Sequence, residues 1–259
     1  MEAMATPVRR FIEWNRRVSR WERTLMARAV PACAIDGPYD FHEHVLPGLL
    51  RAGQRVLDVG GGKHPGISLQ TKRELGLHVV GLDVSEAELA QAPAGAYDAI
   101  VVGDASSVEI PGRYDLVFSR SVIEHVEDPR AVIANLAGVL ASGGIMAHVV
   151  PCRNAPFAIV NRRLGNRLAR RLLFAIFPEK EEHSGFQVHY RDCTPSRLAR
   201  ICRECELEVV QVTPYYNSGY TSFFAPLYTV EMLRQALMCS LRQEDLAESF
   251  SIVARAPQR

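Results

Sequence analysis

Short apolar segments typical of buried strands recur between residues 55 and 150, and segments with helical spacing separate them. The strand candidates span residues 55–59, 78–82, 98–102, 114–119 and 144–150. Before the last of them, residues 128–140 carry a helical apolar stripe, and the following ASGG is expected to stop that helix. Strands that alternate with helices predict a parallel sheet covered on both faces. With right-handed crossovers this is a doubly wound, Rossmann-like α/β fold, with a ligand crevice at the carboxyl ends of the strands.

Both ends of the chain add elements to this core. The N-terminal region predicts a helix, a turn-rich break and a short helix, at residues 7–30, 31–40 and 41–51. Near the other end, Thr194 and then Pro195 mark the start of a helix that runs to about residue 204. A strand, a helix and a strand follow, at residues 206–214, 224–241 and 249–257. If these two strands form an antiparallel edge pair, the mostly parallel sheet has seven strands.

The domain organisation predicted from these elements has two parts. An N-terminal helical cap covers residues 1–50, and the main domain covers residues 51–259. Within the main domain, residues 151–190 form a helical, lid-like insertion after the fifth strand.

Three glycines follow the first strand, in the sequence VLDVGGG. Gly60, Gly61 and Gly62 let backbone amides approach a ligand closely, as a nucleotide-type ligand at a helix N-terminus requires. The nicotinamide template G-x-G-x-x-G fails because Pro65 stands at its third glycine. A phosphate-binding P-loop fails because Lys63 is followed by histidine.

Acidic residues lie at the ends of the first three strands. Asp58, Asp83 and Asp104 therefore meet at one edge of the predicted sheet. Burying unpaired carboxylates is costly, which favours a ligand rich in hydrogen-bond donors. Asp83 could accept from ribose hydroxyls and Asp104 from an adenine amino group. The alternative is that each acid caps the following helix or makes a turn.

The order of these motifs resembles the class I S-adenosylmethionine-dependent methyltransferases. The segments that carry the resemblance are VLDVGGG, VVGLDVS, GDASS, YDLVFSRSVIEHVEDP and LASGGIMAHVVP, within about residues 50–150. The resemblance implies S-adenosylmethionine as cofactor. It assigns Asp58 and Gly60, Gly61 and Gly62 to the methionine end, Asp83 with its neighbour Val84 to the ribose, Asp104 and Ala105 to the adenine, and Ser119 and Arg120 to the sulfonium side. His64 and Pro65 depart from the family pattern, so the loop is expected to be stiffer and longer.

Candidate catalytic residues follow the fourth strand and the insertion. The sulfonium is already activated, so the protein mainly aligns an acceptor, and a general base is needed for a hydroxyl or a protonated amine. Glu124 and His125 could supply that base, whereas the alternative is that His125 only shapes the pocket. By resemblance, His183, His189 and Tyr190 are candidate acceptor contacts. The expected reaction is methyl transfer to oxygen, or less readily nitrogen, of a small-molecule, sugar or lipid-linked acceptor.

Other chemistries receive less support from the residues. The segment after strand four also resembles quinone-precursor O-methyltransferases, in which acids and a histidine can bind a divalent metal. Ser121 stands where those enzymes have an acid, so no metal is expected. Cys202 and Cys205 share an apolar helix face, which favours core packing over zinc binding. A nicotinamide-dependent oxidoreductase and a non-catalytic cofactor-binding module are the rival interpretations.

Composition and charge limit which partners and which cellular compartment are expected. The net charge of +1 gives no overall field for nucleic acid. Six cysteines in 259 residues do not indicate a disulfide framework, and no secretion signal or bilayer-spanning run is seen, so we expect a reduced, cytoplasmic protein. Residues 7–30 and 155–177 are basic and amphipathic. They either make peripheral contact with an anionic membrane or cover the acceptor pocket.

Overall fold

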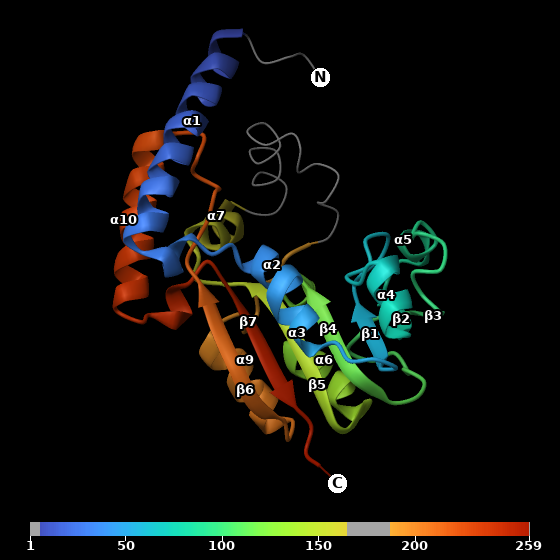
Figure 1. The fold of residues 1–259 in the computed structure, drawn as a ribbon. Coiled ribbons are helices and arrows are strands. Elements are labelled where there is room, and N and C mark those ends of the chain that lie inside the picture. The colour runs from blue at the N-terminus through green and yellow to red at the C-terminus, as the bar shows by residue number, and fades with distance from the viewer. Residues whose placement is uncertain (1–5, 165–186, 259) are drawn as a thin grey trace.

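The computed structural model describes residues 6–164 and 187–258, and its centre is a seven-stranded sheet (Figure 1). The strand order is β3-β2-β1-β4-β5-β7-β6, and β7 runs antiparallel to both of its neighbours. The strands are β1 Arg55–Val59, β2 His78–Asp83, β3 Ala99–Val102, β4 Tyr114–Arg120, β5 Leu140–Pro151, β6 Glu208–Tyr215 and β7 Ser249–Arg255. This confirms the predicted doubly wound sheet with its antiparallel edge pair.

Helices cover both faces of the sheet, and α1 and α10 lie together beyond its β7 and β6 side (Figure 1). The α-helices are α1 Thr6–Ala29, α2 Gly37–Asp40, α3 Leu46–Leu49, α4 Leu69–Leu75, α5 Glu86–Leu89, α6 Pro129–Gly138, α7 Pro156–Leu164, α9 Pro195–Glu204 and α10 Ala225–Ser240. Short 3-10 segments span Pro31–Ala34, Ile123–His125 and Glu244–Leu246, and a π-helical turn spans Phe41–Val45. None of the described helices is long and apolar enough to cross a membrane.

Two apolar cores lie on opposite faces of the sheet, because successive strand residues point to opposite sides. On β4, Val117 belongs to the core that contains residues of α6 and α9. Its neighbours Leu116 and Phe118 belong to the other core, together with Phe41 and Leu46 of the N-terminal segment. Fully buried strands read as near-continuous apolar runs, which is why the central strands could be predicted.

Two predicted boundaries were wrong. The break expected over 31–40 contains the start of α2 at Gly37, where the Asp36 side chain accepts from the Tyr39 N–H. The helix expected to reach residue 140 ends at Gly138, and the ASGG segment lies inside β5. Pairing with β4 starts already between Tyr114 and Leu140, so tertiary contacts extend β5 toward its N-terminal end.

The N-terminal helix α1 packs beside α10 (Figure 1). The Asn15 side-chain oxygen accepts from the Ala225 N–H at 2.9 Å, and Ser19 donates to the Ser222 carbonyl at 3.1 Å. Both α1 residues are buried, so this polar side of the helix faces its neighbour. The other basic segment is described only as α7; its continuation beyond residue 164 lies outside the described residues.

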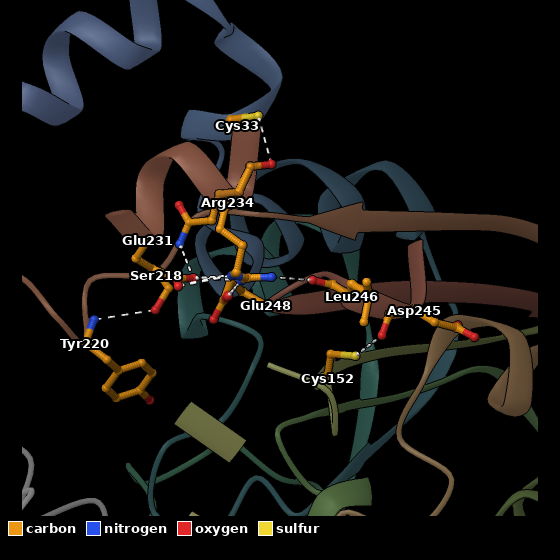
Figure 2. A network of polar contacts seen from close by, with 10 residues as sticks. Cys33, Cys152, Ser218, Tyr220, Glu231, Arg234, Asp245, Leu246 and Glu248 are labelled. Carbon is orange, nitrogen blue, oxygen red and sulfur yellow. Dashed lines mark hydrogen bonds and ion pairs between the residues drawn. The ribbon is translucent and has the colours of Figure 1, made fainter. Parts of the chain in front are cut away.

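A partly buried ion cluster joins α10 to the start of β7. Arg234 pairs with Glu231 on its own helix at 2.6 Å and with Glu248 next to β7. Figure 2 shows the guanidinium beside both acids, and it also donates to the Leu246 carbonyl at 3.2 Å. The Cys33 thiol reaches the Gln235 carbonyl at 3.8 Å, which adds a link to the segment after α1. One side of α10 is thereby directed toward the body of the protein.

Candidate functional site

A cavity of about 670 Å³ opens at the carboxyl ends of β1, β2 and β3 and just beyond β4. Its lining includes Val59 and Gly60 after β1, Asp83 and Val84 after β2, Gly103 to Ser106 after β3, Ser121, Val122 and His125 to Asp128 after β4, and Gln187. This is the predicted crevice of a doubly wound fold. Its volume is in the range of small-molecule and cofactor sites.

The carboxylates of Asp83 and Asp104 stand in the wall of this cavity, and each also forms a turn. Asp83 Oδ1 accepts from the Ser85 N–H at 2.9 Å, and Asp104 Oδ1 accepts from the Ser106 N–H at 2.8 Å. Burial raises the pKa of Asp83, while backbone N–H groups of its own loop act in the opposite direction. Each carboxylate therefore forms the predicted turn and also lies in the cavity wall, while its role toward a ligand stays a prediction.

Gly60 brings backbone to the edge of the cavity in a conformation that favours glycine. Its φ is +69°, and its N–H donates to the Leu82 carbonyl at 2.6 Å. A Cβ at this position would overlap the Val122 side chain. Gly61 and Gly62 are not in the lining; Gly61 lies over Asp58, and Gly62 lies against the Asp83 carboxylate.

Asp58 lies beneath the glycine loop and is only 1% exposed. Its Oδ2 accepts from the Gly66 N–H at 2.7 Å and from the Tyr97 hydroxyl at 3.5 Å. Burial raises the pKa of Asp58 to about 6, although the Gly66 bond and the charge of Arg120 lower it. The same Tyr97 hydroxyl donates to the Gly62 carbonyl at 3.3 Å. Asp58 and Tyr97 thus hold the loop, and Tyr97 has no motif that could have revealed it.

The structure places Ser119 and Arg120 outside the cavity lining. Ser119 is fully buried, and its hydroxyl lies 2.7 Å from His148 Nδ1 inside the sheet. Arg120 donates to the His64 carbonyl at 2.7 Å and so braces the glycine loop. Because β4 runs to Arg120, the residues that reach the crevice are the next ones, Ser121 and Val122.

The chain is similar to a known protein family over most of its length. A family model described as a methyltransferase domain matches residues 24–212, well over half of the chain. The chain belongs to the class I S-adenosylmethionine-dependent methyltransferases. The predicted enzyme class and cofactor are thereby confirmed, and the oxidoreductase interpretation is set aside.

Two curated relatives of this methyltransferase carry the name ubiquinone biosynthesis O-methyltransferase. The protein from Aromatoleum aromaticum is 30% identical over 168 residues, which cover 62% of this chain and 67% of the relative. The protein from Burkholderia pseudomallei is 30% identical over 181 residues, covering 67% and 70%.

A solved structure supports the fold of the methyltransferase. It is phosphoethanolamine N-methyltransferase 2 from Haemonchus contortus in complex with S-adenosylmethionine, with a TM-score of 0.57 and 18% identity. The match covers 85% of this chain and 53% of that protein, so this chain spans about half of that protein's length.

His125 of the methyltransferase lies in the cavity wall, at the end of the 3-10 segment after β4. Its Nδ1 is 2.9 Å from the Gln187 carbonyl. A carbonyl only accepts, so Nδ1 carries the proton and Nε2 is the nitrogen that can take one up. Burial lowers the pKa of His125, and the nearby His189 lowers it further, whereas the Gln187 bond raises it. The imidazole is therefore neutral at neutral pH.

The other candidate catalytic residues surround the main chain of Glu124. The N–H groups of His189 and Tyr190 both donate to the Glu124 carbonyl, at 2.7 and 3.0 Å. Tyr190 is buried and has a φ of +52°, and His189 is partly exposed. His183 lies outside the described residues. Among the described residues, no group of three or more His, Cys, Asp and Glu side chains is placed to hold a metal ion.

The side chain of Glu124 is buried instead of lining the cavity. It is 3% exposed, and its Oε2 has no hydrogen-bond partner. Its Oε1 lies 3.9 Å from His125 Nε2, too far for a hydrogen bond. Burial raises the pKa of Glu124 to about 8, so the group is largely protonated at neutral pH. The sequence motif could not reveal this, because burial depends on the segment that packs over Glu124.

Replacing Glu124 by glutamine should stabilise the protein at alkaline pH. An acid with a raised pKa in the folded state binds a proton that the unfolded chain has released, so stability falls as pH rises from about 4.5 toward about 8. Each unit of pKa shift corresponds to about 1.4 kcal/mol in the free energy of unfolding, and each kcal/mol changes the melting temperature by about 2–4 °C. At pH 8 we expect E124Q to melt about 5 °C or more above the native protein. At pH 4 we expect the two proteins to melt at the same temperature.

Thermal melts across this pH range measure the effect. E127Q is the matched control, since Glu127 is an exposed neighbour on the same segment. Native and E124Q curves that stay parallel from pH 4 to pH 8 would contradict the burial of an ionisable Glu124.

Proposed function

We propose that this methyltransferase transfers the methyl group of S-adenosylmethionine to a hydroxyl oxygen of a small-molecule acceptor. The observation that carries the proposal is the neutral His125 in the cavity wall, with its tautomer set by the Gln187 carbonyl. The names of the curated relatives, which are O-methyltransferases, support the choice of oxygen.

The residues of the cavity fit an adenosyl ligand. Asp83 is assigned to the ribose hydroxyls, and Asp104 with Ala105 to the adenine, because these groups line neighbouring parts of one cavity. Gly60 presents backbone next to them and is assigned to the methionine end. The cofactor supplies an activated methyl group when bound. Asp58 and Arg120 act through the loop, since their contacts are to loop backbone.

His125 is assigned the role of general base. A hydroxyl must lose its proton as its oxygen becomes bonded to carbon, and a neutral imidazole near physiological pH is suited to accept it. The carbonyl of Gln187 holds the ring so that Nε2 is the basic nitrogen. The Gln187 segment also connects to His189 and Tyr190, which we assign to the acceptor side.

Glu124 is assigned a positioning role and not a direct one. Its buried side chain lies outside the cavity lining, whereas its carbonyl anchors the backbone of His189 and Tyr190. Removing the side chain would thus act on the acceptor segment through packing.

A competition between acceptor classes tests the proposal. The protein and methyl-labelled cofactor are incubated with a catechol bearing a prenyl tail, a free sugar and phosphoethanolamine, and labelled products are identified by mass spectrometry. We expect label on an oxygen of the catechol, with the sugar as the lesser acceptor. Label found on the amine, with none on either oxygen acceptor, would refute O-methylation.

A further inference from the structure

The helices α1 and α10 expose an unusual number of large apolar side chains on the side away from the sheet. On α1 these are Phe11, Trp14, Trp21 and Leu25, and on α10 they are Leu227, Val230, Leu233, Leu237 and Leu241. The two tryptophans are 58% and 64% exposed. Soluble monomers rarely gather exposed apolar groups in this way unless the surface has a partner.

The inward sides of both helices are already occupied, so the apolar stripes face outward. Glu231 and Arg234 direct one side of α10 toward Glu248 and the protein body (Figure 2). On α1, Asn15 and Ser19 face the α10 region. The exposed apolar residues of each helix recur at spacings of three, four or seven, so they share one side of the helix, and this side differs from the polar inward side.

The two stripes form one surface. Phe11 contacts Phe224 at a ring-centroid distance of 6.4 Å, and Glu22 of α1 accepts from the Thr229 hydroxyl further along. The helices therefore run parallel, and the first turns of α1 extend beyond the start of α10 (Figure 1). Phe11 and Phe224 are both substantially exposed, so the stripes meet at the surface and not beneath it.

Positive charge accompanies the apolar surface. Helix α1 carries seven arginines against two glutamates. Arg10, Arg17 and Arg28 alternate with Trp14 and Trp21 at helical spacing along one exposed side. Tryptophan and arginine together are typical of helices that lie at a membrane interface, where the ring sits at headgroup level and the guanidinium meets lipid phosphate. Neither helix is able to cross the bilayer.

We propose that α1 and α10 form a docking surface for an anionic lipid membrane, on which the two helices lie flat. The apolar stripes enter the headgroup and acyl boundary, and the arginines of α1 bind the negative surface. A second copy of the chain is a poorer occupant, because pairing would bring two strongly positive α1 helices together. The proposal does not depend on the identity of the methyl acceptor.

Tryptophan fluorescence tests the proposal on the native protein, since Trp14 and Trp21 are its only tryptophans. We expect emission to shift to shorter wavelength, and the protein to sediment with vesicles, when phosphatidylglycerol is present in phosphatidylcholine. Partitioning onto vesicles of pure phosphatidylcholine should be weaker by about tenfold or more. Added salt should reduce binding to the anionic vesicles, because it screens the attraction between the arginines and the lipid phosphates. Absence of a shift with anionic vesicles would overturn the proposal.

Matched variants separate this surface from general stickiness. The double variant L233S with L237S should lose about tenfold or more in vesicle partitioning. The control double variant I100S with V210S removes side chains of similar exposure on the edge strands β3 and β6 and should bind as the native protein does. R17Q should weaken partitioning about fivefold, and R73Q on α4 should not. Equal losses in both double variants would contradict the assignment.

Two further measurements complete the test. Melting with and without S-adenosylhomocysteine shows that each variant is folded and binds ligand. Light scattering without lipid shows the mass in solution: a dimer with a concentration-dependent fluorescence shift would assign the surface to a second copy and overturn the membrane proposal.

Discussion

Replacing Gly60 by alanine is expected to weaken binding of S-adenosylhomocysteine by about 100-fold or more. Gly60 has a φ of +69°, a conformation that costs other residues about 1–2 kcal/mol. The new Cβ would also overlap Val122, and relieving such overpacking costs about 1–3 kcal/mol. Both Gly60 and Val122 line the cavity, so this relief displaces the cavity wall itself. Tenfold in affinity corresponds to about 1.4 kcal/mol.

Gly53 provides a matched control for this prediction. It has a φ of +75°, and a Cβ there would meet nothing within 4 Å. G53A therefore carries the same kind of backbone strain without an overlap and lies away from the cavity lining. Titration calorimetry should show native affinity for G53A and a large loss for G60A. Equal affinities of the two variants would mean that the cofactor does not use this part of the loop.

Replacing His125 by glutamine is expected to lower kcat by about 100-fold or more, the usual contribution of a general base. Glutamine can still donate to the Gln187 carbonyl, but it cannot accept a proton at neutral pH. Affinity for S-adenosylhomocysteine should change only a few-fold, because the loss concerns the chemical step. Stopped assays with labelled cofactor, together with calorimetry, separate the two quantities.

The pH profile gives a second readout for His125. Burial lowers the pKa of His125 from its ordinary value of 6.5, so kcat/KM of the native enzyme should rise with pH and pass its midpoint below about pH 6.5. The rise of kcat/KM with pH on the acidic side should be absent from the residual activity of H125Q. H42A, at an exposed histidine in the π-helical turn, should keep the native rate and profile. Unchanged turnover in H125Q would remove His125 from the base role.

Local chemistry explains which elements could be predicted from the sequence. The pair Thr194–Pro195 predicted a helix start, and the Thr194 side chain accepts from the Arg197 N–H at the N-terminus of α9. The central strands are buried on both faces, so their apolar runs show directly in the sequence. Cys202 packs in the core with Leu198 and Ile201, as their shared helix face predicted.

Only those parts of the candidate site that directly follow a strand in the chain could be predicted from the sequence. Asp83 and Asp104 follow strand ends, and parallel strands bring their carboxyl ends to one edge, so their meeting at the cavity could be expected. Whether Ser119 and Arg120 lie in the strand or at the cavity depends on the exact residue at which β4 ends, and sequence patterns do not define strand ends to one residue. Tyr97 and Gln187 reach the site from segments that no motif marks.

The alternation of strands and helices along the chain predicted the doubly wound fold and the edge at which the site was expected, and the resemblance carried by the motifs implied the class of cofactor. These signals are local, because each strand, glycine and acid can be placed from its neighbours in the chain. The burial of Glu124, the position of His125 in the cavity wall and the packing of α1 beside α10 with its tryptophans outward became visible in the folded chain alone. These depend on segments far apart in the chain packing against each other, and burial, pKa and exposure arise from that packing.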